Sequence, residues 1–170
     1  IATPDVEGRV FIAPDGREIA FSFDPAEDKR FDHAYGMVAL DIPGGRFRTL
    51  TEGSKLSHEH PRYSPDGRWL AMMSQDVAKS YVAPFWLTLQ ERSSGKLTYV
   101  SRKWDRSLHS PIAWESDSQS VLFAAENLAR QHLWRWTLGA REPEKVVEGG
   151  TVMEFDVAAG CRVYVHNTMS

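Results

Sequence analysis

The sequence predicts an all-β fold built from repeated four-stranded antiparallel units, and three observations support this prediction. One turn sequence recurs at a fixed interval: Ala13-Pro14-Asp15-Gly16 is followed 51 residues later by Ser64-Pro65-Asp66-Gly67. Short runs of β-branched, aromatic and aliphatic residues, separated by Gly, Pro and Ser, fill the intervals between these copies. No window shows a sustained helical period, and the nearest candidate, residues 126–132, is too short for a helix.

Each copy of the turn sequence is expected to form a tight β-hairpin. Pro presets φ at about −65° in a type I turn, and Gly adopts the left-handed conformation that closes it. A third copy, Glu115-Ser116-Asp117-Ser118, lies another 51 residues on and keeps the Asp, while Ser replaces both Pro and Gly. A weaker fourth copy spans residues 155–164 and lacks the Asp. We interpret Asp15, Asp66 and Asp117 as caps of the repeated turn.

Two further strands are expected after each hairpin. They lie at 37–42 and 46–50 in the first unit, 85–90 and 97–100 in the second, and 132–138 and 145–147 in the third. Four antiparallel strands repeated every 41–51 residues predict the blades of a β-propeller, whereas a β-sandwich would lack the repeated turn. We therefore predict a partial β-propeller of about three to four blades. The blade units are placed at 9–51, 60–101, 111–148 and, in part, 152–170.

Length and composition exclude several classes of function. Lys and Arg (20) are scattered among 23 Asp and Glu, so no nucleic-acid partner is expected. No apolar run approaches the roughly 20 residues that a membrane span needs. The 170 residues equal about 3.3 repeats, fewer than the 4–8 blades of complete propellers. Because the first residues are Ile1-Ala2 and the last predicted strand runs almost to the end, we expect a fragment of a longer protein, with its compartment undetermined.

Two clusters of potential metal ligands are interpreted as structural. His58 and His60 would share one face of a strand, but zinc needs three or four ligands and no partner lies at finger-like spacing. We interpret the His58-Glu59-His60 segment as a polar loop that enters the second hairpin. A group of acidic residues lies in a predicted loop, and its spacing does not match a calcium-binding loop, so a solvated loop is expected. These residues are Asp24, Glu27, Asp28 and Asp32.

Three further candidates are also interpreted as structural. Asp105 and Arg106 are expected to form a turn with a local hydrogen bond or ion pair. Trp134 and Trp136 alternate along a predicted strand and are expected to pack in the core or between blades. The single cysteine, Cys161, cannot form an intrachain disulfide and is expected to be a buried, unreactive thiol. We therefore assign no catalytic, cofactor-binding or metal-binding residue.

Two stretches of the sequence carry a family resemblance. The segment Tyr63-Ser64-Pro65-Asp66-Gly67-Arg68-Trp69-Leu70-Ala71 resembles the propeller repeat of the TolB-like group. The turn Trp104-Asp105-Arg106-Ser107, followed by a hairpin that begins at Trp114 and by Ala125-Glu126, resembles the dipeptidyl aminopeptidase and acylaminoacyl peptidase branch of the prolyl oligopeptidase family. The resemblance covers roughly residues 9–165.

The resemblance implies that an α/β-hydrolase domain with a Ser-Asp-His triad follows the propeller. This sequence contains no Gly-x-Ser-x-Gly nucleophile elbow, so the catalytic domain is expected to be absent from this chain. The implied role is a non-catalytic scaffold and gate for short peptide substrates, with the hydrolase domain of the same protein as partner. Some family members hold a substrate's N-terminus with acidic propeller residues, but no motif assigns that role to Glu52, Glu59 or Glu126.

Alternative functions remain open on the sequence alone. One is a TolB-like propeller that binds a protein partner and catalyses nothing. Another is a carbohydrate-active or lactonase-type propeller enzyme with an axial metal or acidic site, for which we find no ligand set. Independently, unpaired blade edges would favour homo-oligomerisation, since exposed strand edges tend to pair with another chain.

Overall fold

The computed structural model describes residues 10–24, 34–79, 82–147, 149–158 and 161–167. Within these ranges the chain forms strands β1–β14, with no helix, arranged as four antiparallel sheets in chain order. The first sheet contains β1 (Phe11–Ile12), β2 (Glu18–Phe23), β3 (Gly36–Asp41) and β4 (Phe47–Thr49). The second contains β5 (Ser57–Tyr63), β6 (Trp69–Gln75), β7 (Trp86–Glu91) and β8 (Leu97–Tyr99). The third contains β9 (Leu108–Trp114), β10 (Ser120–Asn127), β11 (Arg130–Thr137) and β12 (Glu144–Lys145). The fourth is the hairpin of β13 (Thr151–Ala158) and β14 (Cys161–Asn167).

The repeated turn has the same geometry in the first three sheets. The Oδ1 atoms of Asp15, Asp66 and Asp117 each accept a hydrogen bond from the backbone amide two residues further on, at 3.0, 3.0 and 2.9 Å. The residue after each Asp has a positive φ of 70°, 70° and 60°, and in the third turn this residue is Ser118 instead of Gly. The predicted capping role of the three Asp residues is confirmed. Ser118 adopts the left-handed conformation because the surrounding hairpin requires it.

The segment with the nearest approach to a helical period forms a hairpin. Residues of β10 and β11 pair from Ser120 with Thr137 to Asn127 with Arg130. Leu128 and Ala129 connect them with φ of 52° and 60°. Positive φ at both central residues is the geometry of a two-residue turn that matches strand twist.

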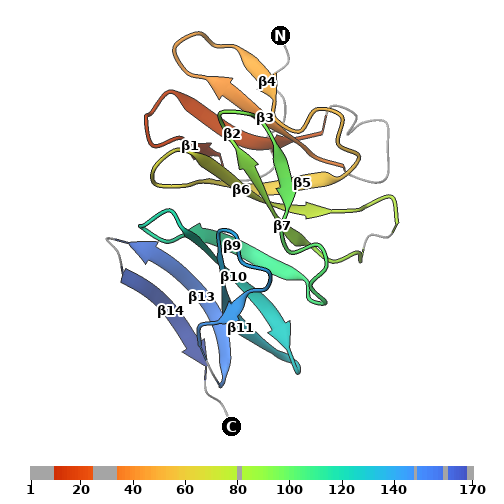
Figure 1. The fold of residues 1–170 in the computed structure, drawn as a ribbon, viewed down its shortest axis with the longest axis vertical. Helices are drawn as coiled ribbons and strands as arrows, with labels where there is room; N and C mark the ends of the chain where they lie inside the picture. Colours follow the sequence, from red (N-terminus) through yellow and green to blue (C-terminus); the bar gives the residue numbers. More distant parts are fainter. Residues whose placement is uncertain (1–9, 25–33, 80–81, 148, 159–160, 168–170) are drawn as a thin grey trace.

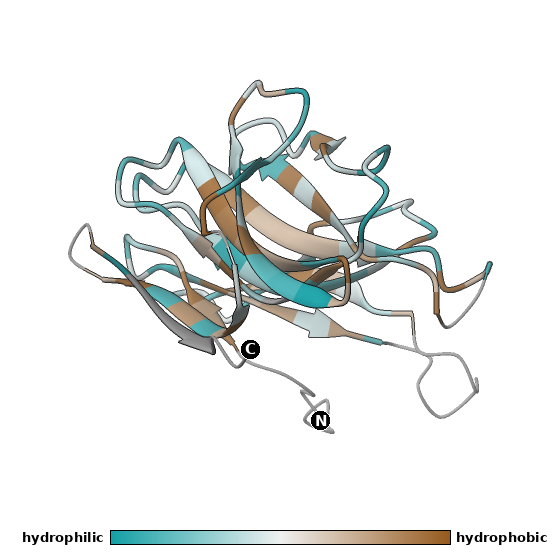
Figure 2. Cartoon of the chain, turned by 90° about the horizontal axis from the view of Figure 1, so that it is seen from below, coloured by the Kyte–Doolittle hydropathy of each residue, from teal (hydrophilic) through white to brown (hydrophobic). Residues whose placement is uncertain are grey.

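Consecutive sheets pack face to face, and a separate apolar cluster fills each interface. Hydrophobic residues accordingly lie mainly within the strands, and hydrophilic residues gather in the turns (Figure 2). Between the first and second sheets the cluster contains Ala20, Met37, Ala39, Leu50, Leu70 and Met72. Between the second and third it contains Ala71, Met73, Leu87, Leu89, Leu108, Ile112, Trp114, Val121, Phe123, Ala125, Trp134 and Trp136. Between the third and fourth it contains Leu122, Ala124, Leu133, Val147, Val152 and Phe155. The predicted packing role of Trp134 and Trp136 is confirmed.

The sheets succeed one another along the molecule, and their first strands lie together. In Figure 1 the first sheet is at one end of the stack and the β13–β14 hairpin is at the other. Strand β5 contacts β1, strand β9 contacts β5, and strand β13 contacts β9. The sheets therefore meet along their first strands, which is the arrangement of blades around a common axis.

Polar contacts reinforce the sheet interfaces. The Tyr63 hydroxyl of the second sheet donates to Glu18 of the first at 2.6 Å, and Arg92 lies 3.4 Å from the same carboxylate. Burial alone would raise the pKa of Glu18, but the hydrogen bonds from Tyr63 and Arg48 outweigh it and lower the pKa. The indole Nε1 of Trp114 in the third sheet donates to the Arg62 carbonyl of the second at 2.9 Å.

The capping geometry gives a test of the repeated turn. We expect Asp66→Ala to lower the free energy of unfolding by about 1 kcal/mol, because the Arg68 amide and the Ser64 hydroxyl both lose their acceptor. Urea denaturation followed by tryptophan fluorescence measures this change. The control is Asp105→Ala, whose side chain is 79% exposed. Equal unfolding midpoints for the two variants would contradict the capping role.

Candidate functional site

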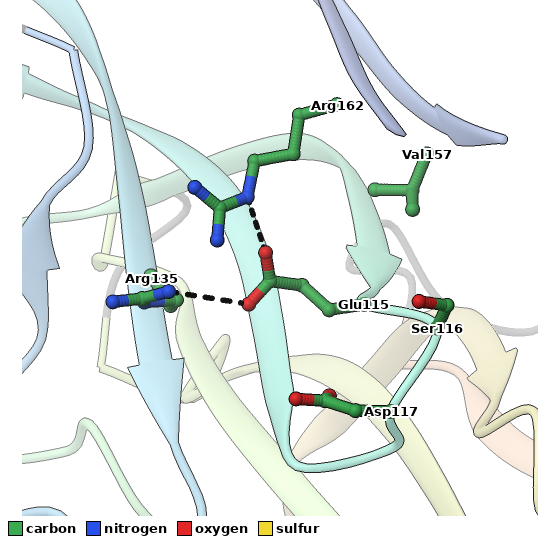
Figure 3. A pocket seen from close by; sticks show the side chains of 6 residues that line it. All are labelled: Glu115, Ser116, Asp117, Arg135, Val157 and Arg162. Atoms are coloured by element: carbon green, nitrogen blue, oxygen red, sulfur yellow. Dashed lines mark hydrogen bonds and ion pairs between the residues drawn. The ribbon is translucent and has the colours of Figure 1, made fainter. Parts of the chain in front are cut away.

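The strongest candidate for a site is a polar cavity between the third sheet and the β13–β14 hairpin. The cavity has a volume of about 430 Å³ and lies beside the β9–β10 turn (Figure 3). Its walls come from that turn, from β11 and from the two strands of the hairpin. The lining residues are Glu115, Ser116, Asp117, Arg135, Val157 and Arg162.

One carboxylate holds two guanidinium groups in this cavity. Glu115 forms an ion pair with Arg162 of the hairpin through Oε1, and its Oε2 lies 3.6 Å from Nη1 of Arg135 (Figure 3). Arg135 also pairs with Glu144 on β12. The hydrogen bond with Glu144 raises the pKa of Arg135, and Glu115 adds to this effect against the opposing effect of burial. Glu115 belongs to the third sheet and Arg162 to the hairpin, so their ion pair clamps the third sheet to the hairpin. Both guanidinium groups in the cavity already have carboxylate partners.

Sequence reasoning did not identify this clamp. Glu115 and Arg162 are 47 residues apart, and the fold alone brings them together. One signal was present: Glu115 occupies the turn position held by Ala13 and Ser64 in the first two repeats. A large charged residue at a small-residue position of a repeat indicates a contact that the other copies do not make.

The His58-Glu59-His60 segment lies inside β5, so its prediction as a polar loop was wrong. A register shift between Glu59 and Arg62 and a positive φ of 54° at His60 interrupt the strand, so the two histidines do not share a regular strand face. His58 is fully buried, whereas the side chain of His60 is 39% exposed. No cluster of three or more potential metal ligands occurs among the described residues.

His58 is the centre of a buried hydroxyl network. Its Nε2 lies 2.8 Å from Ser54 Oγ, and its Nδ1 lies 2.8 Å from Ser74 Oγ, which in turn lies 2.7 Å from Thr88 Oγ1. Burial lowers the pKa of His58 to about 4. An imidazole with such a low pKa is a weak base, so the Ser54–His58 contact is better suited to holding the connection between the first two sheets than to activating a nucleophile.

A second cavity, of about 530 Å³, lies where the β8–β9 connection meets β11 and the β11–β12 turn. Nε of Arg106 lies 3.8 Å from Oδ1 of Asp105, which confirms the predicted local ion pair. The guanidinium of Arg106 lies 5.7 Å from the ring centroid of Trp104 and 5.5 Å from that of Trp134. Through these cation–π contacts, Arg106 packs against the apolar cluster between the second and third sheets.

The first strands of the second and third sheets carry ionisable side chains. Burial raises the pKa of Glu59 on β5, and a hydrogen bond from Ser57 partly offsets that effect. His109 on β9 lies 4.0 Å from Glu126. These groups are separate, and each has a local partner.

Two further sequence predictions fall in this part of the molecule. Cys161 is exposed, so the prediction of a buried thiol was wrong. It begins β14 beside the turn of the hairpin and pairs with Ala158, which is also exposed. Asp24 is buried and accepts a hydrogen bond from the Ala34 amide at 3.1 Å, whereas residues 27, 28 and 32 lie outside the described residues.

In the portion of the chain that the structure describes, no helix has the length and apolar character needed to cross a bilayer.

Comparisons with known proteins agree with the repeated-sheet architecture. No protein-family model matches the chain. Dipeptidyl-peptidase 5 of Porphyromonas gingivalis is 27% identical over 150 residues, which cover 81% of this chain and 20% of that protein. The chain thus spans about a fifth of the length of this relative.

Two solved structures show the fold. The β-propeller domain of the trilobed protease from Pyrococcus furiosus superimposes with a TM-score of 0.69 at 15% identity, covering 94% of this chain and 45% of that one. TolB from Acinetobacter baumannii superimposes with a TM-score of 0.64 at 15% identity, covering 94% of this chain and 38% of that one. The predicted fold class is confirmed: the chain is a partial β-propeller of the kind found in TolB and in the propeller domain of the trilobed protease.

The buried imidazole predicts a pH dependence of stability. The pKa of His58 falls from 6.5 to about 4 on folding, so between these values the unfolded chain binds a proton that the folded chain does not. The free energy of unfolding is therefore at its full value with respect to His58 above pH 6.5. It falls as the pH is lowered toward 4, by about 3 kcal/mol in all. Urea denaturation between these pH values measures the slope.

His58→Leu is expected to flatten this slope, because Leu cannot bind a proton. The matched control is His109→Gln, since the side chain of His109 is 42% exposed. A slope that His58→Leu leaves unchanged and that His109→Gln removes would contradict the assignment.

The clamp predicts that Glu115 contributes to stability at the third interface. We expect Glu115→Gln to lower the free energy of unfolding by about 1 kcal/mol, because Arg135 and Arg162 lose a shared counter-charge. The control is Glu154→Gln, on the exposed side of β13. Thermal unfolding at low and high salt measures both variants, and an effect of Glu115→Gln that salt does not reduce would contradict an ionic clamp.

Proposed function

We propose that this chain forms part of the non-catalytic N-terminal propeller of a serine peptidase that cleaves short peptides, of the dipeptidyl or acylaminoacyl type. The observation that carries the proposal is the 27% identity with dipeptidyl-peptidase 5 over 150 residues. A protease propeller domain is also among the structures that superimpose on 94% of the chain. The catalytic role is proposed for the whole protein and not for this chain alone. The chain spans only about a fifth of the length of dipeptidyl-peptidase 5.

The chemistry itself would come from another domain of the same protein. A hydrolase of this type needs a nucleophilic serine on a sharp strand–helix turn, within a Gly-x-Ser-x-Gly sequence. The chain contains no such sequence. Among the described residues, the Ser–His contact at Ser54 and His58 has an imidazole with a pKa of about 4, which does not suit a general base at neutral pH. The partner we propose is therefore an α/β-hydrolase domain.

The chain's contribution would be scaffold and gate. Its sheets are held together by apolar clusters at all three interfaces and by ionic contacts at Glu18 and Glu115. Such a rigid stack supports a neighbouring domain without deforming. The first strands β5 and β9 lie side by side, and in a complete propeller these strands line the central channel. A narrow channel and a covered cleft would admit short peptides and exclude folded proteins.

The complete gene and its product test this function. We expect the coding sequence to contain a Gly-x-Ser-x-Gly elbow outside residues 1–170, and the full-length protein to release dipeptides or acylamino acids from short peptides. Replacing the elbow serine by alanine should abolish hydrolysis while leaving thermal unfolding unchanged. The rate should fall steeply from short peptides to unfolded proteins of the same composition.

Two results would overturn the proposal. One is a complete gene without the elbow. The other is a full-length protein without hydrolytic activity that instead forms a stoichiometric complex with another protein, which would favour a TolB-like binding propeller.

A further inference from the structure

The cavity of about 530 Å³ beside the β8–β9 connection is lined by cationic side chains that have few partners. Lys103 and Arg106 come from the connection, and Arg141 comes from the β11–β12 turn. In the part of the chain that the structure describes, Lys103 and Arg141 form no hydrogen bond or ion pair. Arg106 has one long ion pair, of 3.8 Å, with Asp105, whose side chain is 79% exposed. The cavity at Glu115 differs, because both of its guanidinium groups are paired with carboxylates.

The acidic residues of this cavity do not balance its cations. Asp105 and Glu142 are the two carboxylates among the lining residues, against three cationic side chains, so one positive charge is in excess. Glu142 is exposed and, among the described residues, has no ion-pair partner. Like charges on the wall of one cavity repel one another, and a bound anion offsets this repulsion.

An indole N–H group at the same cavity also lacks an acceptor. Trp136 lines the cavity and is 2% exposed, and its Nε1 is buried without a hydrogen-bond partner among the described residues. Trp134, two residues earlier on β11, donates instead from Nε1 to the Ala125 carbonyl at 3.2 Å. A buried N–H group without an acceptor indicates that a water, an ion or a ligand completes it. The cations and this N–H group therefore call for the same partner, a negatively charged hydrogen-bond acceptor.

The rest of the cavity wall is aromatic and held in place. The ring of Trp104 meets those of Phe123 and Trp134 edge to face, with centroids 5.7 and 5.0 Å apart. The Trp104 amide donates to the Ser101 carbonyl at 3.0 Å, and Ser101 Oγ accepts from the Leu87 amide of β7 at 2.7 Å. A wall that is fixed before binding loses little conformational freedom when a ligand arrives.

We propose that this cavity binds a small organic carboxylate whose apolar part is aromatic or aliphatic. Its volume falls within the range of about 300–1,000 Å³ that is usual for small-molecule sites. The single excess positive charge matches a monoanion, and the two lining carboxylates disfavour an anion with two charges, such as phosphate. The aromatic wall accommodates the apolar part of the ligand. The proposal concerns binding alone and does not depend on peptidase activity.

Binding requires a local rearrangement at the indole. Because Nε1 of Trp136 is closed to solvent, a carboxylate reaches it only when a lining side chain moves aside. Lys103 and Arg141 are exposed and unpaired within the described residues, and exposed side chains of this kind change rotamer within nanoseconds. The ligand thus gains charge-assisted hydrogen bonds from the cations as they close over it.

Isothermal titration calorimetry of the full-length protein tests the proposal with matched probes. These are 3-phenylpropionate, its neutral amide 3-phenylpropionamide, and inorganic phosphate. We expect 3-phenylpropionate to bind, and the amide and phosphate to bind at least about tenfold more weakly. Arg141→Gln is expected to weaken the binding of 3-phenylpropionate by about tenfold as well. The control is Arg130→Gln, an exposed residue at the start of β11 that does not line the cavity, and this variant should bind as the unmodified protein does.

The fluorine resonances of 5-fluorotryptophan-labelled protein locate the bound probe. Trp136→Phe and Trp86→Phe identify the two signals. Trp86 is the matched control, because its Nε1 is also buried without a partner among the described residues but it does not line this cavity. We expect 3-phenylpropionate to shift the Trp136 signal and to leave the Trp86 signal in place.

Four results would overturn the proposal. The first is the absence of binding by 3-phenylpropionate. The second is equal binding of the carboxylate and the amide, which would show an apolar cavity without an anion site. The third is phosphate binding as tight as that of 3-phenylpropionate, which would show a general attraction of anions. The fourth is binding that Arg141→Gln leaves unchanged and that does not shift the Trp136 signal, which would place the probe elsewhere in the protein.

Discussion

Face-to-face packing of sheets that are apolar on both sides is the constraint on which the rest of this structure depends. Strand β6 shows it most directly, because six of its seven residues are buried, Leu70 and Met72 against the first sheet and Ala71 and Met73 against the third. A sheet with two apolar faces is not stable in water by itself. The repeat therefore stabilises the protein only as a stack, in which each blade provides the cover for its neighbours.

The interface carboxylates of Glu18 and Glu115 fit into this scheme because each is paired with a residue of the neighbouring sheet. Glu18 joins the first two sheets through Tyr63 and Arg92, and Glu115 joins the last two through Arg162. A buried or half-buried carboxylate without such partners would cost more than it contributes. The polar clusters of this chain thus serve chiefly to connect neighbouring blades. The same architecture occurs in a protease and in TolB, and fold alone does not assign a reaction.

The sequence allowed the fold to be predicted because turn chemistry is local. Asp15, Asp66 and the glycine after each are sufficient to place a hairpin, and Ser118 shows that the repeat tolerates an imperfect copy. The candidate sites depended on long-range geometry. Glu115 and Arg162 meet only when the hairpin packs on the third sheet. The hydroxyl partners of His58 come from two different segments, Ser54 before β5 and Ser74 on β6, and alternation of residue types does not reveal such a network. Cys161 was predicted to be buried because several residues near it in the sequence are apolar, but it lies at the turn end of a hairpin and is exposed.

If interface packing is the source of stability, residues of one cluster on two different sheets are energetically coupled. A double-mutant cycle across the first interface measures this coupling most directly. Met37→Ala and Leu70→Ala change residues of one cluster on two different sheets, whereas Leu122 belongs to another cluster. We expect a coupling of about 0.5–3 kcal/mol between Met37→Ala and Leu70→Ala, and additivity within about 0.5 kcal/mol between Met37→Ala and Leu122→Ala. Additive effects of Met37→Ala and Leu70→Ala would contradict a stability that comes from interface packing, because the two sheets would then be stabilised independently of each other.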